Sequence, residues 1–155
     1  DDISVAELEK LLTDGAATVV DVGRSLDYRQ GHIPGAWFAV RSRLEKGLDA
    51  VPVEGLLVMT SGDGIVARLA ATEAENLVST PVACLAGGTD AWKAAGSPMV
   101  DGEEYMADIP DDMWLRPYDR SSGVAEAMNA YLSWEVDLVD QIDRDGTTDF
   151  QIFPE

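Results

Sequence analysis

Short apolar segments alternate with helix-like segments from Thr18 to Gly96, and this alternation constrains the fold more than any other feature of the chain. The apolar segments are brief and rich in β-branched residues, which is typical of strands buried on both faces of a parallel sheet. The predicted strands are 18–22, 56–59 and 81–86. The predicted helices are 5–14, 26–30, 65–77 and 90–95, with a further helical turn at 41–46. The sequence therefore predicts an α/β domain with a mostly parallel sheet.

Capping residues support these helices. Ser4, Ser25 and Thr89 each precede a helix-like segment, where a side-chain oxygen accepts hydrogen bonds from the first N–H groups of a helix. Gly15 and Gly47 stand where the first helix and the turn at 41–46 are predicted to end.

The segment from Val58 to Arg68 places a predicted strand, a tight loop and a helix N-terminus in direct succession. Successive backbone N–H groups of such a loop point into one concavity, which favours an anion. We therefore expect the functional site at this loop, with Ser61 at its base. The predicted anion-binding residues are Ser61, Gly62, Asp63, Gly64, Ile65 and Val66.

Length and charge limit the classes of function. A chain of 155 residues is long enough for one domain with its own core. It carries 29 acidic residues against 11 Lys and Arg, which disfavours nucleic acid and anionic membrane surfaces as partners. The single cysteine, Cys84, excludes an internal disulfide and favours a reducing, cytoplasmic location. The start at Asp1, without Met, suggests a piece of a longer protein.

The composition changes toward the C-terminus. Residues 103–120 show no clear period and are predicted to form an extended arm. Residues 123–144 approximate an amphipathic helix, whose apolar stripe must pack on the domain or on a neighbour. Residues 149–153 alternate like an edge strand. We therefore predict a domain over 1–102 and an acidic extension over 103–155, the helix of which docks in cis or exchanges between subunits.

Three motifs, in order and spacing, resemble those of the rhodanese (sulfurtransferase) superfamily. The first is Val20-Asp21-Val22, followed by Tyr28 and by Gly31-His32-Ile33-Pro34-Gly35-Ala36. The second is the loop at Ser61, and the third is Leu85-Ala86-Gly87-Gly88-Thr89-Asp90-Ala91-Trp92. The resemblance covers about residues 4–100 and implies the rhodanese fold, a five-stranded, mainly parallel sheet flanked by helices. The extension is similar to the one that follows the last repeat in some bacterial proteins built from several rhodanese repeats.

Active members of this superfamily open the loop with a cysteine, which takes up a sulfane sulfur as a persulfide and passes it to a thiophile such as cyanide. Ser61 stands at that position and Gly64 at the glycine of the loop. A hydroxyl is far less acidic than a thiol and forms no persulfide. Val66 and Gly23 stand where many members carry arginine, and Asp63 places a carboxylate where thiosulfate would dock. The resemblance thus implies a degenerate loop without a catalytic residue.

The resemblance also implies structural roles for the other motif residues, which are Asp21, Asp27, His32, Gly87, Gly88 and Trp92. His32 is expected to brace its turn, and the two acids to pair with arginine and to cap backbone N–H groups. A hydrolase in which His32 activates Ser61 is disfavoured, because the loop lacks the glycine spacing of a nucleophile elbow. The acids of the extension lack the ligand spacing of a calcium loop, and we predict no metal and no cofactor.

These observations favour a catalytically inactive rhodanese-like domain that is a structural or regulatory partner of an active repeat. The expected partners are sister repeats of the same chain or a homo-oligomer, with a small anion in the loop. Two alternatives stay open at this point: a thiosulfate sulfurtransferase or persulfide carrier that uses Cys84, and an anion-binding module. Cys84 lies in an apolar run, 82–85, where a buried thiol is inert, so its exposure decides the first alternative.

Overall fold

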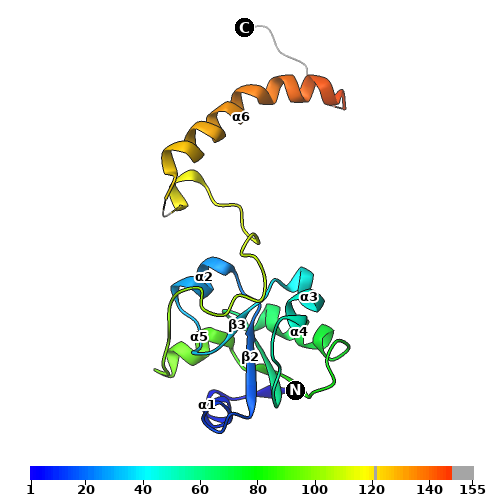
Figure 1. The fold of residues 1–155 in the computed structure, drawn as a ribbon, viewed down its shortest axis with the longest axis vertical. Coiled ribbons are helices and arrows are strands. Elements are labelled where there is room, and N and C mark those ends of the chain that lie inside the picture. Colours follow the sequence, from blue (N-terminus) through cyan, green and yellow to red (C-terminus); the bar gives the residue numbers. More distant parts are fainter. Residues whose placement is uncertain (121, 148–155) are drawn as a thin grey trace. The chain divides into compact units, whose positions relative to one another are not determined.

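The structure is a computed structural model that describes residues 1–120 and 122–147. The chain divides into two compact units, of which the first ends at Met113 and the second begins at Trp114. Figure 1 shows both units in the colours of the sequence. The predicted edge strand at 149–153 lies outside the described residues. Within the described residues, no helix is long and apolar enough to cross a membrane.

The first unit is built on a five-stranded sheet whose order is β1-β5-β4-β2-β3. The strands are β1 (Asp2–Ile3), β2 (Ala17–Asp21), β3 (Trp37–Phe38), β4 (Leu56–Thr60) and β5 (Val82–Leu85). All neighbouring strands pair in parallel, with Val20 opposite Met59 and Met59 opposite Cys84. The predicted α/β fold with a five-stranded, mainly parallel sheet is therefore confirmed.

Helices cover both faces of the sheet in the first unit (Figure 1). They are α1 (Val5–Thr13), α2 (Ser25–Gln30), α3 (Leu44–Asp49), α4 (Ile65–Ala74) and α5 (Gly88–Ala94), with a single 3₁₀ turn, η1 (Arg41–Arg43), before α3. The Ser4 cap is confirmed, because its hydroxyl and the Glu7 side chain form a reciprocal capping box.

Three expectations about helix ends are wrong, each for a local reason. Ser25 is the first residue of α2, and its N–H is bound by Asp112 instead. Thr89 lies inside α5, because its N–H donates to the Ser61 carbonyl. Gly47 lies inside α3, where an added Cβ would stand 3.0 Å from the Cβ of Ala39. Glycine there allows α3 to approach the chain that leaves β3.

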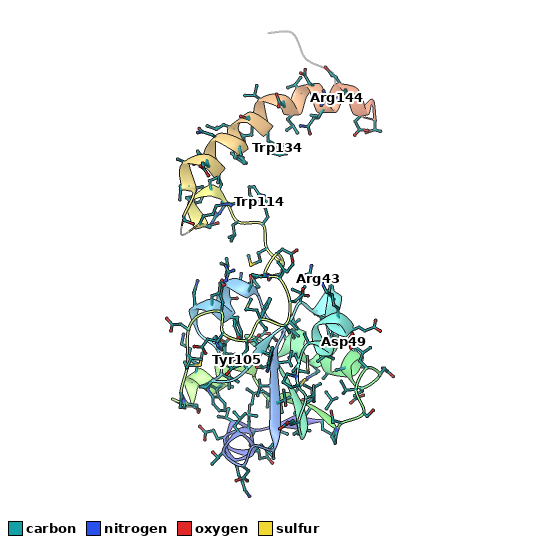
Figure 2. The ribbon with its side chains drawn as sticks, in the orientation of Figure 1. Arg43, Asp49, Tyr105, Trp114, Trp134 and Arg144 are labelled. Carbon is teal, nitrogen blue, oxygen red and sulfur yellow. The ribbon has the colours of Figure 1, made fainter. Side chains whose placement is uncertain are left out.

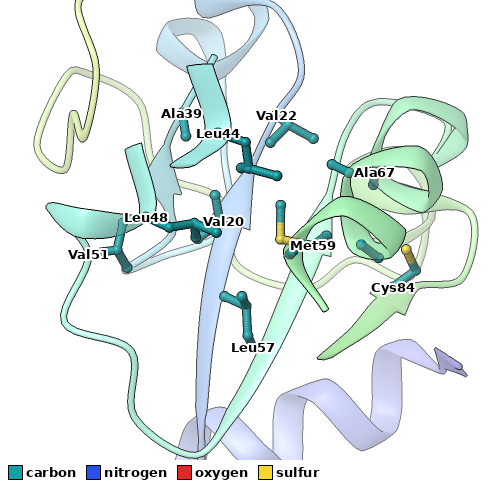
Figure 3. Packing of buried hydrophobic residues seen from close by; sticks show 13 residues of the cluster. Val20, Val22, Ala39, Leu44, Leu48, Val51, Leu57, Met59, Ala67 and Cys84 are labelled. Atoms are coloured by element: carbon teal, nitrogen blue, oxygen red, sulfur yellow. The ribbon is translucent and has the colours of Figure 1, made fainter. Parts of the chain in front are cut away.

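Alternating side chains of the strands divide the core into two clusters. One face of the sheet buries Val20, Leu57 and Met59 against α3 and α4 (Figure 3). The other face buries Val19 and Val58 against α1, α2 and α5. This period of two is what strands buried on both faces require. The carboxyl ends of the strands are thereby fixed in one row at one edge of the sheet.

The segment that follows Gly102 remains bound to the first unit as far as Met113. The Phe38 N–H donates to the Tyr105 carbonyl at 2.7 Å, so the segment lies beside β3. Arg43 also binds it, through Asp108 at 2.8 Å and Asp111 at 2.6 Å. These carboxylates raise the pKa of the Arg43 guanidinium above its ordinary value, because they favour its charged form. Figure 2 shows Arg43 and Tyr105.

The second unit contains a 3₁₀ turn, η2 (Pro117–Asp119), and a long helix, α6 (Val124–Asp145). The predicted C-terminal helix is confirmed. Trp114 and Trp134 flank Tyr131, with ring centroids 6.1 Å and 6.0 Å from it (Figure 2). No described side chain of α6 is buried in the chain.

Candidate functional site

The candidate site is a cleft of about 700 Å³ at the carboxyl ends of β2 and β4. Parallel α/β proteins place their sites at this edge, because loops from neighbouring strands converge there. Asp21 ends β2 and Ser61 follows β4, so both sit at the base of the cleft. The other lining residues are Gly23, Arg24, Asp27, Tyr28, Gln30, Gly31, Gly62, Asp63, Val66, Thr89, Asp90, Lys93 and Met99.

Ser61 is held at the base of the cleft by three hydrogen bonds. Its Oγ accepts the Ala67 N–H at 3.1 Å. Its carbonyl accepts the N–H groups of Gly64 at 3.0 Å and of Thr89 at 3.1 Å. Only 2% of the residue is exposed, which leaves the hydroxyl a narrow approach from the cleft. The Ser61 side chain therefore lies at the base of the loop, with a backbone donor already bound to its Oγ.

Close contact between two glycine positions gives the loop its shape. Gly64 and Gly88 have φ angles of 82° and 64°. Residues other than glycine adopt this left-handed backbone conformation only at a cost in free energy. A Cβ at Gly88 would overlap the carbonyl oxygens of Ser61 and Gly62. The Gly87-Gly88 pair thus lets the start of α5 lie directly against the loop.

A buried polar network supports the cleft from below. The Asp21 carboxylate accepts the Gly23 N–H at 2.8 Å and the Thr89 hydroxyl at 3.2 Å. Thr89 Oγ1 lies 2.9 Å from Thr60 Oγ1, so the network joins β2, β4 and α5. Burial raises the pKa of Asp21 to about 6, because the charged form loses its hydration, although the Gly23 and Thr89 hydrogen bonds act against this shift.

Carboxylates outnumber cations around the cleft. Asp63 and Asp90 line it together with Asp21 and Asp27, against Arg24 and Lys93. Arg24 is bound by Asp27 at 2.6 Å, which raises the pKa of the guanidinium and neutralises it locally. An anionic ligand therefore meets more negative than positive charge in this cleft.

His32 lies away from the chemistry of Ser61. It is fully buried and does not line the cleft among the described residues. Its ring stacks on Tyr28 with centroids 3.7 Å apart. Its Nδ1 lies 2.8 Å from the Tyr28 carbonyl, which can only accept, so Nδ1 carries the proton. His32 thus packs against Tyr28 of its own turn, outside the set of residues that line the cleft with Ser61.

Trp92 and Cys84 are core residues. Trp92 is 3% exposed and its indole N–H donates to the Pro98 carbonyl at 2.7 Å. Cys84 is also 3% exposed and packs in the cluster that contains Met59 (Figure 3). Burial raises the pKa of the Cys84 thiol, because the charged thiolate would lose its hydration.

Sequence reasoning missed Thr60, Thr89 and Asp90 as parts of the site. Thr60 and Thr89 carry no signal of their own, because only the register of β4 against its neighbours brings their hydroxyls together. Asp90 could have been found from its place shortly after the Gly-Gly pair. In the structure, the Asp90 N–H donates to the Gly62 carbonyl at 2.8 Å. Among residues 1–120 and 122–147, no group of three or more His, Cys, Asp or Glu side chains could hold a metal ion.

Comparisons with known proteins agree with this architecture. A thiosulfate sulfurtransferase from Pseudomonas aeruginosa is 39% identical, with a TM-score of 0.91, over 99% of this chain and 29% of that chain. The human single-domain sulfurtransferase is 28% identical, with a TM-score of 0.53, over 60% of this chain and 95% of that chain. A Rhodopseudomonas palustris protein of unknown function, described as a possible tyrosine phosphatase, is 26% identical, with a TM-score of 0.56, over 64% of this chain and 84% of that chain. The comparison with curated proteins gave no match.

The chain thus spans less than a third of the length of the Pseudomonas aeruginosa enzyme. The family model for the rhodanese-like domain matches residues 4–95, which hold the strands β2 to β5, the Ser61 loop and the Gly87-Gly88 turn. The chain belongs to the rhodanese-like domain family.

Proposed function

We propose that the chain is a rhodanese-like domain without sulfurtransferase activity of its own. The observation that carries this proposal is Ser61, which occupies the base of the loop with its Oγ bound to the Ala67 N–H. Sulfur transfer by a cysteine at this place begins when its thiolate attacks the outer sulfur of thiosulfate, and the S–S bond breaks as sulfite leaves with the electron pair. Cyanide then takes the terminal sulfur as thiocyanate. Ser61 supplies no thiolate for the first step.

Burial of Cys84 argues against the alternative in which this residue carries sulfur. A persulfide carrier needs an accessible thiolate, and the Cys84 side chain packs in the core with a raised pKa. An anion-binding module remains the second candidate, because Gly62, Asp63 and Val66 of the loop and the first turn of α4 line the cleft, and a helix N-terminus favours an anion.

Three chains test the lack of activity: native, Ser61→Cys and Cys84→Ala. We expect the native chain and Cys84→Ala to show no transfer of sulfur from thiosulfate to cyanide. We expect Ser61→Cys to gain measurable transfer, because the Ala67 N–H then stabilises a thiolate. Activity of the native chain that Cys84→Ala abolishes would instead assign the reaction to Cys84.

We further propose that the domain is a partner of an active rhodanese repeat. The support is the exposure of large apolar side chains along α6, where Leu132, Trp134, Val136 and Val139 are all at least 49% exposed. A helix whose apolar side chains stay open to water is favoured to pack on another surface. This chain covers 29% of the Pseudomonas aeruginosa sulfurtransferase, so the proposal places it in a longer protein that also holds an active repeat.

The negative charge of α6 favours a different domain, and not a second copy of this chain, as the partner that packs on the helix. The helix carries six acidic residues and one arginine, so two copies would bring like charges together. We therefore expect sedimentation velocity to give a monomer at low ionic strength, and a dimer that Trp134→Asp dissolves would assign α6 to self-association. The single thiol favours a reducing, cytoplasmic setting for this assembly.

A further inference from the structure

The second unit contains a groove of about 990 Å³ between residues 114–120 and the first half of α6. Trp114, Tyr131 and Trp134 line it with aromatic rings (Figure 2). The two tryptophans are 70% and 50% exposed, so their rings are open to an incoming group. Among the described residues, none lines both this groove and the cleft at Ser61, so the groove is a separate feature.

The lining residues from α6 have the size and spacing that a second helix fits. Gly123, Ala127, Ala130 and Trp134 follow one another at steps of three or four residues. They therefore lie on one side of the helix, over about 17 Å or three turns. Small residues beside bulky ones let the side chains of another helix approach the backbone closely.

The charge of this unit favours a cationic occupant. Glu126 lines the groove. A hydrogen bond with Glu135 raises the pKa of the Tyr131 hydroxyl, so a second carboxylate lies beside the aromatic rings. Arg120 lines the groove as well and acts against a cation, but α6 as a whole carries six acidic residues and one arginine.

The aromatic rings strengthen this preference, because the face of an indole or phenol ring attracts a cation. The same unit already holds such a contact, in which the Arg116 guanidinium lies 4.8 Å from the centroid of the Tyr118 ring. Arginine suits the groove better than lysine, since its planar group can stack on a ring while it pairs with a carboxylate.

We propose that this groove is the docking site of an arginine-bearing amphipathic helix of a partner protein. The apolar side chains of that helix pack on the aromatic rings, and its arginines pair with Glu126 and Glu135. The inference rests on the proposed role of the domain as a partner, and it names the surface and the kind of segment that binds there. Val136 lies about half a turn around α6 from Ala127 and Trp134, so docking on the other side of the helix can be told apart.

The probe is a synthetic amphipathic helix of leucine and arginine, about 14 residues long, which spans the groove with about four turns. Two control peptides carry glutamine or glutamate in place of every arginine. Calorimetry gives the affinity of each peptide for the native chain, and NMR of the indole N–H signals of Trp114 and Trp134 reports where it binds. We expect the arginine peptide to bind most tightly, to shift both indole signals, and to bind at least about tenfold more tightly than the glutamate peptide.

Substitutions in the groove should change this affinity in opposite directions. Glu126→Gln should weaken binding of the arginine peptide about twofold to fivefold, and Arg120→Gln should strengthen it by a similar factor. Trp134→Ala should weaken binding at least about tenfold, as the loss of a central aromatic anchor does. The matched controls are Leu69→Ala and Glu45→Gln, because both residues are exposed, lie in the first unit and do not line the groove. Both controls should bind like the native chain, and circular dichroism checks that each variant keeps its helices.

Equal affinity of the native chain and Trp134→Ala would overturn the proposal, as would equal binding of the arginine and glutamate peptides or no binding at millimolar peptide. Binding that Val136→Ala weakens more than Trp134→Ala does would assign the partner to the other side of α6. That result would overturn the groove as the docking site and leave the proposed partner role intact. Sulfur transfer by the native chain would count against the proposed inactivity alone, because peptide binding needs no reaction at Ser61 or Cys84.

Discussion

At the scale of single residues, the buried Asp21 carboxylate is part of a hydrogen-bond network that joins β2, β4 and α5. Its carboxylate binds Gly23 and Thr89, and Thr89 reaches Thr60. Burial raises the pKa of Asp21 to about 6, so the folded state holds this proton more tightly than the unfolded chain does. Ionisation of Asp21 therefore opposes folding, and the free energy of unfolding falls as the pH rises from about 4 to about 6.

Asp21→Asn should remove this pH dependence. The amide can accept the Gly23 N–H and donate to Thr89, so the network is kept without a charge. We expect Asp21→Asn to gain about 3 kcal/mol relative to the native chain between about pH 4 and pH 7, measured by urea unfolding at each pH. A difference between the two proteins that is constant with pH would show that Asp21 does not titrate in this range.

Gly88→Ala should be far more costly than Gly15→Ala. Both glycines have nearly the same φ, 64° and 65°, but only Gly88 lacks room for a Cβ, because the Ser61 and Gly62 carbonyls lie against it. We expect a loss of about 1 kcal/mol for Gly15→Ala from backbone strain alone, and of about 3 kcal/mol or more for Gly88→Ala. Similar losses in thermal or urea unfolding would mean that the loop can move away from α5.

At the scale of elements, the alternation of strands and helices was sufficient to predict β2, β4 and β5 and the helices around them. β1 and β3 were missed, because strands of two residues carry no readable period and are held by pairing with β5 and β2. The Thr89 cap was predicted wrongly, since the Ser61 carbonyl, remote in sequence, takes its N–H. The loop at Ser61 could be placed from the sequence, but the contacts of Asp63 and Asp90 depend on how β4 and β5 align.

Within α6, protection from hydrogen exchange should be uneven. Tyr131 packs against Trp114, and α6 also contacts η2, whereas Val136 and Val139 further along the helix are 79% and 65% exposed. We expect N–H groups of residues 136–145 to exchange at least about tenfold faster than those of 128–134, and both faster than β2 and β4. Equal protection of α6 and β4 would contradict an unpartnered helix.

At the scale of the whole molecule, the two units differ in the features that bear on function. The first unit is a complete rhodanese-like fold that retains the loop and the Gly-Gly contact but has serine at its base. The second unit offers an acidic helix with exposed apolar side chains. These two features are the basis of our proposal that the domain is an inactive partner in an assembly.

The most direct test of the proposed lack of sulfurtransferase activity is the intact mass of the native chain and of Ser61→Cys after incubation with thiosulfate. We predict that the native chain gains no mass, because Ser61 forms no persulfide and Cys84 is buried. Ser61→Cys should gain the mass of one sulfur atom, removable by cyanide and located at position 61 by peptide mapping. A cyanide-sensitive sulfur on the native chain at Cys84 would contradict the central claim.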